Sequence, residues 1–155
     1  MRRALGFVVL TLAVAACGSS GVTRSSYAQK ANALCSRYTK RLERLQLTQP
    51  TKASVRRLLD RTVRIVRDEN AALRAVEPPR SERKGVHAML AAREQLVDVF
   101  ARNRDAIAEL AVSSAQGRDP KAVARLQAIL GPPQERARRL TLALGLKTCA
   151  REFRT

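Results

Sequence analysis

The sequence is poor in aromatic residues, with no tryptophan, two tyrosines and three phenylalanines among 155 residues. Its apolar content comes mostly from alanine, leucine and valine, and no window shows the sustained alternation of a β-strand. Such residues pack well between helices, whereas sheets favour aromatic and β-branched side chains. The composition therefore predicts an all-α protein.

The sequence also lacks a recognisable catalytic set. His87 is the only histidine, with no cysteine nearby and no Glu-x-x-His spacing, and Ser113 and Ser114 have no identifiable base partner. Carboxylates at helical spacing are interleaved with arginines, which predicts solvated ion pairs rather than acid–base or metal chemistry. These residues are Glu94, Asp98, Asp105 and Glu109, with Arg93, Arg102 and Arg104. We therefore expect no enzyme, cofactor or metal.

No apolar run is long enough to span a bilayer, which takes roughly 20 residues. The longest follows Arg2 and Arg3 and extends from Leu5 to Ala16, which predicts a cleaved export signal at 1–16. Residues 17–25 then form an expected flexible tether rich in Gly and Ser, and residues 26–155 a single domain.

The end of this signal resembles the bacterial lipobox. Val14-Ala15-Ala16-Cys17 has an aliphatic residue, two small residues and then a cysteine. The resemblance implies that Cys17 carries a diacylglycerol and, after cleavage, anchors the protein at the extracytoplasmic face of the cell membrane. The alternative is an ordinary secretory signal with an unmodified cysteine.

The sequence has three cysteines, and assigning Cys17 to the lipid leaves Cys35 and Cys149 as a pair. In an exported protein such a pair predicts a disulfide, with two free thiols as the alternative. This bond would hold the C-terminus against the first helix.

Periodic apolar residues predict four helices. The first runs from Tyr27 to Leu45 with Ser26 as N-cap and Gln29 as its partner, and the second from Thr51 to Val76. The third is one long rod from Ser81 to Gly117, with a weak point at Gly85. The fourth starts at Asp119-Pro120, is kinked at Pro132-Pro133 and ends at Gly145, before a segment that folds back.

Four amphipathic helices with short connections predict an antiparallel up-and-down four-helix bundle. Together, the lipobox, the opening YAQKANALCSRY, the Pro-Pro break and the closing LGLKTCA resemble the small, largely uncharacterised helical lipoproteins of high-GC Gram-positive (actinobacterial) bacteria. This resemblance implies location, a helical domain and the Cys35–Cys149 pairing. It implies no catalytic or ligand-binding residue.

The formal net charge is +17, and loss of Arg2 and Arg3 with the signal leaves +15. Three arginine groups are candidate sites for an anionic ligand such as a phospholipid headgroup or a wall polymer. They are Arg37, Arg41 and Arg44; Arg57, Arg61 and Arg64; and Arg136, Arg138 and Arg139. The alternative is that these arginines only solvate the outer helix faces. Export and the lack of aromatic stacking residues argue against nucleic acid.

Two functions fit these observations. The favoured one is a non-enzymatic structural or interaction scaffold of the cell envelope with a basic surface. The second is a binding module that holds an apolar or anionic lipid-like ligand between its helices, where Ala31, Ala72, Ala111 and Ala137 leave room. A pocket lined by Tyr27, Tyr38, Leu73 and Phe100 would favour this second function. The identity of any protein partner and the oligomeric state are not encoded in a recognisable motif.

Overall fold

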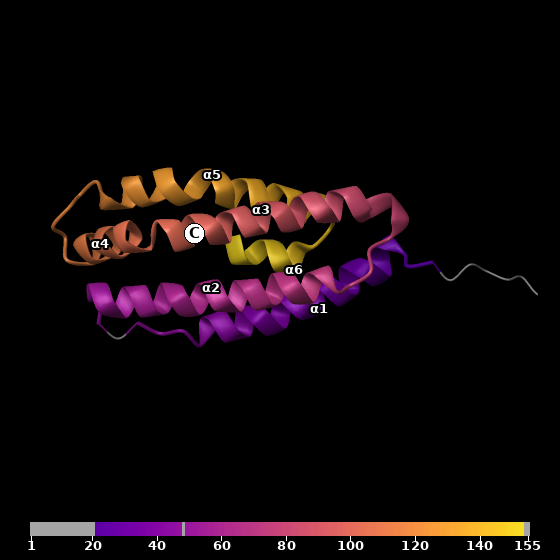
Figure 1. Ribbon diagram of the computed structural model, residues 1–155, viewed down its shortest axis with the longest axis horizontal. Helices are drawn as coiled ribbons and strands as arrows, with labels where there is room; N and C mark the ends of the chain where they lie inside the picture. Colours follow the sequence, from indigo (N-terminus) through magenta and orange to yellow (C-terminus); the bar gives the residue numbers. More distant parts are fainter. Residues whose placement is uncertain (1–20, 48, 154–155) are drawn as a thin grey trace, which may run out of the picture.

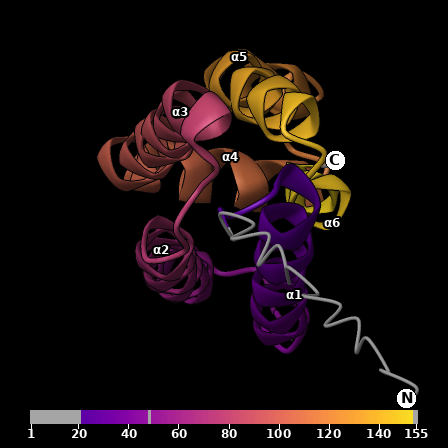
Figure 2. The ribbon, with the colours of Figure 1, turned by 90° about the vertical axis from the view of Figure 1, so that its right-hand side faces the viewer.

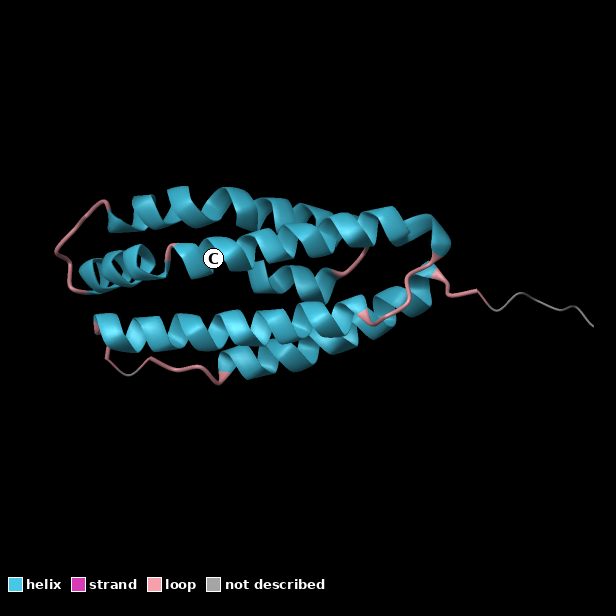
Figure 3. Ribbon diagram, in the orientation of Figure 1, coloured by secondary structure: helices cyan, strands magenta, loops and turns pink. Residues whose placement is uncertain are grey.

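The computed structural model describes residues 21–47 and 49–153 (Figure 1). Cys17 and the expected export signal lie outside these ranges. Within them the chain is all-helical and contains no strand (Figure 3). The helices are α1 (Arg24–Glu43), α2 (Lys52–Arg74), η1 (Arg80–Glu82), α3 (Arg83–Arg102), α4 (Arg104–Ala115), α5 (Ala122–Ala143), α6 (Lys147–Ala150) and η2 (Arg151–Phe153).

The long helices extend along the long axis of a helical bundle (Figure 1). Helix α2 packs against α1, α3 and α4, and α5 packs against α3 and α4. In the end-on view, α1 and α2 lie below α3 and α5, and the short α6 lies next to α1 (Figure 2). The all-α prediction is confirmed, but the described ranges hold six α-helices rather than four.

Capping boxes begin the first two helices. Thr23 and Ser26 exchange side-chain to backbone hydrogen bonds at the start of α1, as Thr51 and Ser54 do at α2. Each box satisfies two amides that have no partner inside the helix. The predicted N-cap, Ser26, was wrong because Thr23 takes that position. The helix therefore begins inside the stretch expected to be a tether.

The predicted third helix is divided in two at Asn103. The side-chain amide and the backbone N–H of Asn103 both donate to the Val99 carbonyl, at 2.9 and 3.0 Å, where α3 ends. The prediction of one rod was wrong because the backbone leaves the helical conformation at Asn103, with φ −101° and ψ 14°, while the Asn103 side chain bonds back to the preceding turn. Gly85, the expected weak point, lies within α3, where a Cβ would come 3.2 Å from Leu144 Cδ2.

Helix α5 begins at Ala122, three residues after the predicted cap. The Asp119 carboxylate accepts a hydrogen bond from the Lys121 amide at 2.9 Å, so it closes a turn before the helix instead of capping it. The helix continues through Pro132 and Pro133. Its end matches the prediction: Gly145 has φ +74°, and the Leu146 amide donates back to the Thr141 carbonyl.

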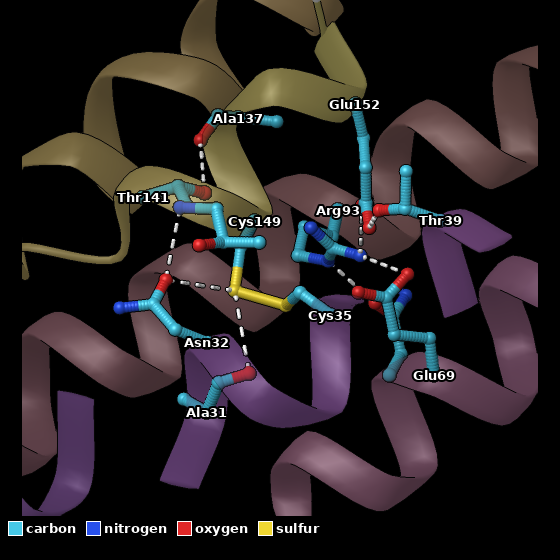
Figure 4. Close-up of a disulfide and its surroundings, with 12 residues drawn as sticks. Ala31, Asn32, Cys35, Thr39, Glu69, Arg93, Ala137, Thr141, Cys149 and Glu152 are labelled. Atoms are coloured by element: carbon cyan, nitrogen blue, oxygen red, sulfur yellow. Dashed lines mark hydrogen bonds and ion pairs between the residues drawn. A yellow bond between two sulfur atoms is a disulfide. The ribbon is translucent and has the colours of Figure 1, made fainter. Parts of the chain in front are cut away.

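The main core lies where α1, α2 and α3 meet the C-terminal segment. Its buried residues are Tyr27, Ala31, Cys35, Leu73, Val86, Met89, Leu90, Leu144, Leu146 and Cys149. The predicted disulfide joins Cys35 of α1 to Cys149 of α6, with their Cα atoms 5.0 Å apart (Figure 4). Beside it, Asn32 Oδ1 accepts a hydrogen bond from the Thr148 amide at 2.9 Å. The C-terminal segment is therefore held on α1.

Replacing both Cys35 and Cys149 by alanine should lower the free energy of unfolding by about 4 to 5 kcal/mol. The bond spans 114 residues and restricts the unfolded chain accordingly. Chemical denaturation of the variant and of the wild type, each with and without reductant, measures the loss. Reductant should bring the wild type close to the variant. Equal denaturation midpoints for the oxidised wild type and the variant would contradict the prediction.

Candidate functional site

A basic groove lies between α2 and the junction of α3 with α4. Its volume is about 590 Å³. We call it the arginine groove, and its walls are Arg57, Leu59, Asp60, Arg61, Val63, Arg64, Arg67, Phe100, Ala101 and Arg104. Leu59, Val63 and Phe100 are half-buried, whereas the five arginines are exposed. The groove therefore combines an apolar base with a cationic rim.

Helical periodicity aligns four of these arginines. Arg57, Arg61, Arg64 and Arg67 follow one another at steps of three and four residues, so they share one face of α2. No carboxylate of residues 21–47 or 49–153 lies within ion-pair distance of these four guanidinium groups. Arg104, on the opposite side, is instead paired with Asp60 at 3.3 Å and with Asp105 at 3.5 Å. The α2 row is thus the uncompensated cationic part of the groove.

The three predicted arginine groups do not form one site. Only Arg57, Arg61 and Arg64 line the groove, and Arg67 and Arg104 join them. Arg67 continues the same spacing and was detectable in the sequence, whereas Arg104 is brought there by the fold.

The other two groups lie on other helices and line no part of the groove. On α1, Arg37 and Arg44 are exposed, and Arg41 pairs with Asp68 at 3.5 Å and stacks on Tyr38. On α5, Arg136 donates to Gln95 and Arg138 pairs with Glu135, at 3.2 and 3.3 Å, while Arg139 is exposed.

The pocket expected from Tyr27, Tyr38, Leu73 and Phe100 is not formed by those four residues. Tyr27 and Leu73 are buried in the main core. Tyr38 is half-buried, with Arg41 over its ring and its hydroxyl donating to the Asp68 carbonyl of α2. Phe100 alone contributes to the groove. Of the four alanines expected to leave room, Ala31 and Ala137 are fully buried. The hollow therefore lies between α2 and α3 rather than at these alanines.

Next to the disulfide lies a buried ionic cluster around Arg93, whose side chain is 1% exposed (Figure 4). Its guanidinium lies 2.8 Å from Glu69 and 3.2 Å from Glu152, and its Nε donates to Asn70 Oδ1 at 2.7 Å. Thr39 of α1 donates to Glu152 at 3.1 Å. The Phe153 ring lies 5.2 Å from the guanidinium carbon. The cluster thus joins α1, α2, α3 and η2.

The prediction of solvated ion pairs was wrong for Arg93 and right for most of the carboxylates. Asp105 pairs with Arg56 at 2.8 Å, Glu109 pairs with Lys52 at 2.8 Å, and Glu94 pairs with Arg74. All of these side chains are exposed. The Lys52 ammonium lowers the pKa of Glu109.

His87 is also exposed. No sequence pattern distinguished Arg93 from its exposed neighbours, because burial depends on which residues of α2 and η2 face it.

The two buried carboxylates share one guanidinium. Burial raises the pKa of the Glu69 carboxyl to about 8; Arg93 opposes this rise, and Glu152 adds to it. Atoms of Cys35, Glu69 and Glu152 lie within 4.8 Å of one another, a spacing that metal sites also have. Here the sulfur of Cys35 belongs to the disulfide, and Arg93 contacts both carboxylates. Glu69 therefore holds a proton in the folded chain, and Glu152 pairs with the Arg93 cation.

Among the described residues, no helix combines the length and hydropathy needed to cross a membrane. Comparisons with protein-family models, curated proteins and solved structures gave no match for this chain.

The raised pKa of Glu69 predicts a stability that falls as pH rises. The folded chain keeps a proton on Glu69 that the unfolded chain releases near pH 4.5, so alkali favours unfolding until the folded-state pKa near 8 is passed. Between pH 5 and 8 this contribution is lost at up to about 1.4 kcal/mol per pH unit.

Denaturation curves at several pH values measure this slope. Glu69→Gln, which cannot titrate, should flatten the curve over the same window. An equal slope in Glu69→Gln and in wild type would assign the titration to another group.

Proposed function

We propose that this protein is a non-enzymatic binding protein for anionic, phosphate-bearing ligands, and that the arginine groove is its binding site. The observation that carries this proposal is the row Arg57, Arg61, Arg64 and Arg67, which lines a groove without carboxylate partners among the described residues. Guanidinium groups bind phosphate through forked, charge-assisted hydrogen bonds. Four of them in a row along one helix face offer such hydrogen bonds to an anionic ligand in the groove.

We further propose the location that the lipobox resemblance implies. A diacylglycerol on Cys17 would hold the domain at the extracytoplasmic face of the cell membrane, because two acyl chains anchor a protein far more firmly than one. The bundle, which we interpret as an elaborated antiparallel four-helix scaffold, would then lie near anionic phospholipid headgroups. The groove lies toward the end of the bundle opposite the start of α1, so it would reach the headgroups with the long axis of the bundle along the membrane (Figure 1). A location at the membrane is consistent with an anionic ligand, because each basic residue near an anionic membrane surface contributes about 1 kcal/mol to binding.

The envelope scaffold, which the sequence favoured, is the second candidate. The full burial of Ala31 and Ala137 favours it, because helices in contact at alanine pack closely and need no ligand between them. Binding by a scaffold would depend on the total positive charge of the surface, whereas binding at the groove would depend on the positions of particular arginines. The difference can therefore be tested with variants of equal net charge.

Neutralising Arg57, Arg61 and Arg64 together by glutamine should weaken binding to anionic vesicles about 100-fold at low salt. Each lost cation removes about 1 kcal/mol of attraction. The matched control is Arg37→Gln, Arg44→Gln, Arg139→Gln, which removes the same charge from exposed positions outside the groove. Co-sedimentation with anionic and neutral vesicles across a salt series measures both variants. Equal losses in the two variants would support the scaffold and contradict a groove-specific site.

The membrane anchor has its own test. Cys17→Ala should abolish lipidation and release the protein from the membrane fraction, because no other acyl chain would hold it. Cell fractionation and intact-mass measurement follow the change, with the wild type in parallel. Unchanged membrane retention of Cys17→Ala, together with an unmodified Cys17 in the wild-type protein, would refute the anchor.

A further inference from the structure

Beneath the arginine groove lies a smaller, mostly apolar pocket of about 120 Å³. Val63 of α2 and Phe100 of α3 line both spaces, so they form the boundary between groove and pocket. The other walls of the pocket are Leu42, Thr62, Val66, Arg93, Leu96, Val97, Gln134, Glu152 and Phe153. The apolar pocket is thus adjacent to the arginine groove, and the side chains of Val63 and Phe100 separate the two.

The size of the pocket limits what it can hold. Cavities of about 150 Å³ lined by leucine, isoleucine and phenylalanine stay dry and bind benzene. A pocket of comparable volume suits about six carbons of one slender chain, and it is too small for the paired chains of a diacyl lipid. Binding pockets of this kind use apolar walls for affinity and a few polar groups for orientation.

Charge determines which end of a ligand enters. The rim carries four arginines without carboxylate partners among the described residues. The guanidinium at the inner wall, Arg93, is instead paired with the Glu152 carboxylate and also contacts Glu69, which holds a proton. An anion is therefore attracted to the rim and gains no net attraction at the inner wall. Arg93 Nη1 is buried and has no hydrogen-bond partner among the described residues. The inner end of the pocket thus offers one hydrogen-bond donor, Arg93 Nη1, but no net positive charge.

We propose that the arginine groove and the apolar pocket form one site for a single-chain amphiphile with a phosphate head. The phosphate contacts the α2 arginines, and the first carbons of the chain pass between Val63 and Phe100 into the pocket. This inference rests on the proposed function, because it adds a chain site to the phosphate site. It also narrows the ligand class from any anionic membrane surface to single-chain molecules, because the chain must leave the bilayer to enter the pocket.

Isothermal titration of the non-acylated Cys17→Ala protein with a series of alkyl phosphates tests the proposal. Inorganic phosphate supplies the head alone, and n-alkyl phosphates from methyl to decyl, below their micelle concentrations, add the chain. Each buried methylene should lower Kd about fourfold. The gain should stop at about six carbons, where the pocket is full. Alkyl alcohols of the same lengths, which lack the anion, should bind far more weakly.

A pocket-filling variant separates the two parts of the site. Val66 lines the pocket but not the groove, so Val66→Phe should leave the Kd for inorganic phosphate unchanged and remove the gain from chain length. The matched control is Val123→Phe, at an exposed position of α5 outside both spaces. Thermal melts confirm that each variant is folded. Should Val66→Phe not fold, Leu96→Phe is the second filling variant, because Leu96 also lines only the pocket.

The outcomes distinguish this inference from the proposed function. Phosphate binding that depends on Arg57, Arg61 and Arg64 but shows no gain with chain length overturns the chain site and leaves the proposed function standing. A chain-length gain that persists in Val66→Phe also overturns it, because the chain then lies elsewhere. Absence of phosphate and alkyl phosphate binding in the folded protein overturns both. A gain up to about six carbons that is lost only in the filling variant supports both.

Discussion

The buried guanidinium of Arg93 is the constraint on which the rest of this structure depends. Removing a cation from water costs several kcal/mol unless charged and hydrogen-bonding partners surround it. Here the partners come from three other elements: Glu69 and Asn70 of α2, Glu152 of η2 and, through Glu152, Thr39 of α1. An interior of alanine, leucine and valine alone would tolerate several helix registers. We interpret the Arg93 cluster as the feature that favours one of them.

The disulfide acts at the same place as this cluster. Cys35 and the two buried carboxylates lie together, so the covalent bond and the ionic contacts both hold the C-terminal segment against α1, α2 and α3 (Figure 4). That segment is short: α6 and η2 together extend only from Lys147 to Phe153. Two of its residues, Glu152 and Phe153, also form walls of the apolar pocket. The elements that stabilise the bundle therefore also close the inner end of the proposed binding site.

The distribution of charge, more than its amount, distinguishes the arginine groove. Many surface arginines are paired with carboxylates, as Arg41, Arg56, Arg74 and Arg104 are, and such exposed pairs contribute little to stability. The α2 row has no such partners in the described part of the chain. The break at Asn103 contributes here, because α4 restarts with Arg104, which lies opposite the α2 row and pairs across the groove with Asp60 of α2. A local interruption of the helix thus shapes one wall of the site.

Residue periodicity was sufficient to predict that the chain is helical, the Gly145 cap and the shared face of Arg57, Arg61 and Arg64, because these depend on neighbours within two or three turns. The Cys35–Cys149 bond also followed from the sequence, because three cysteines leave one pair once Cys17 is assigned to lipid. The break at Asn103 was missed because the apolar pattern continues through it, although the backbone leaves the helical conformation there. Only the tertiary structure decided that Arg93 is buried while nearby Arg102 is exposed, and that Val63 and Phe100 line both a basic groove and an apolar pocket. Burial and pocket shape depend on contacts between distant segments, and helical periodicity carries no information about those contacts.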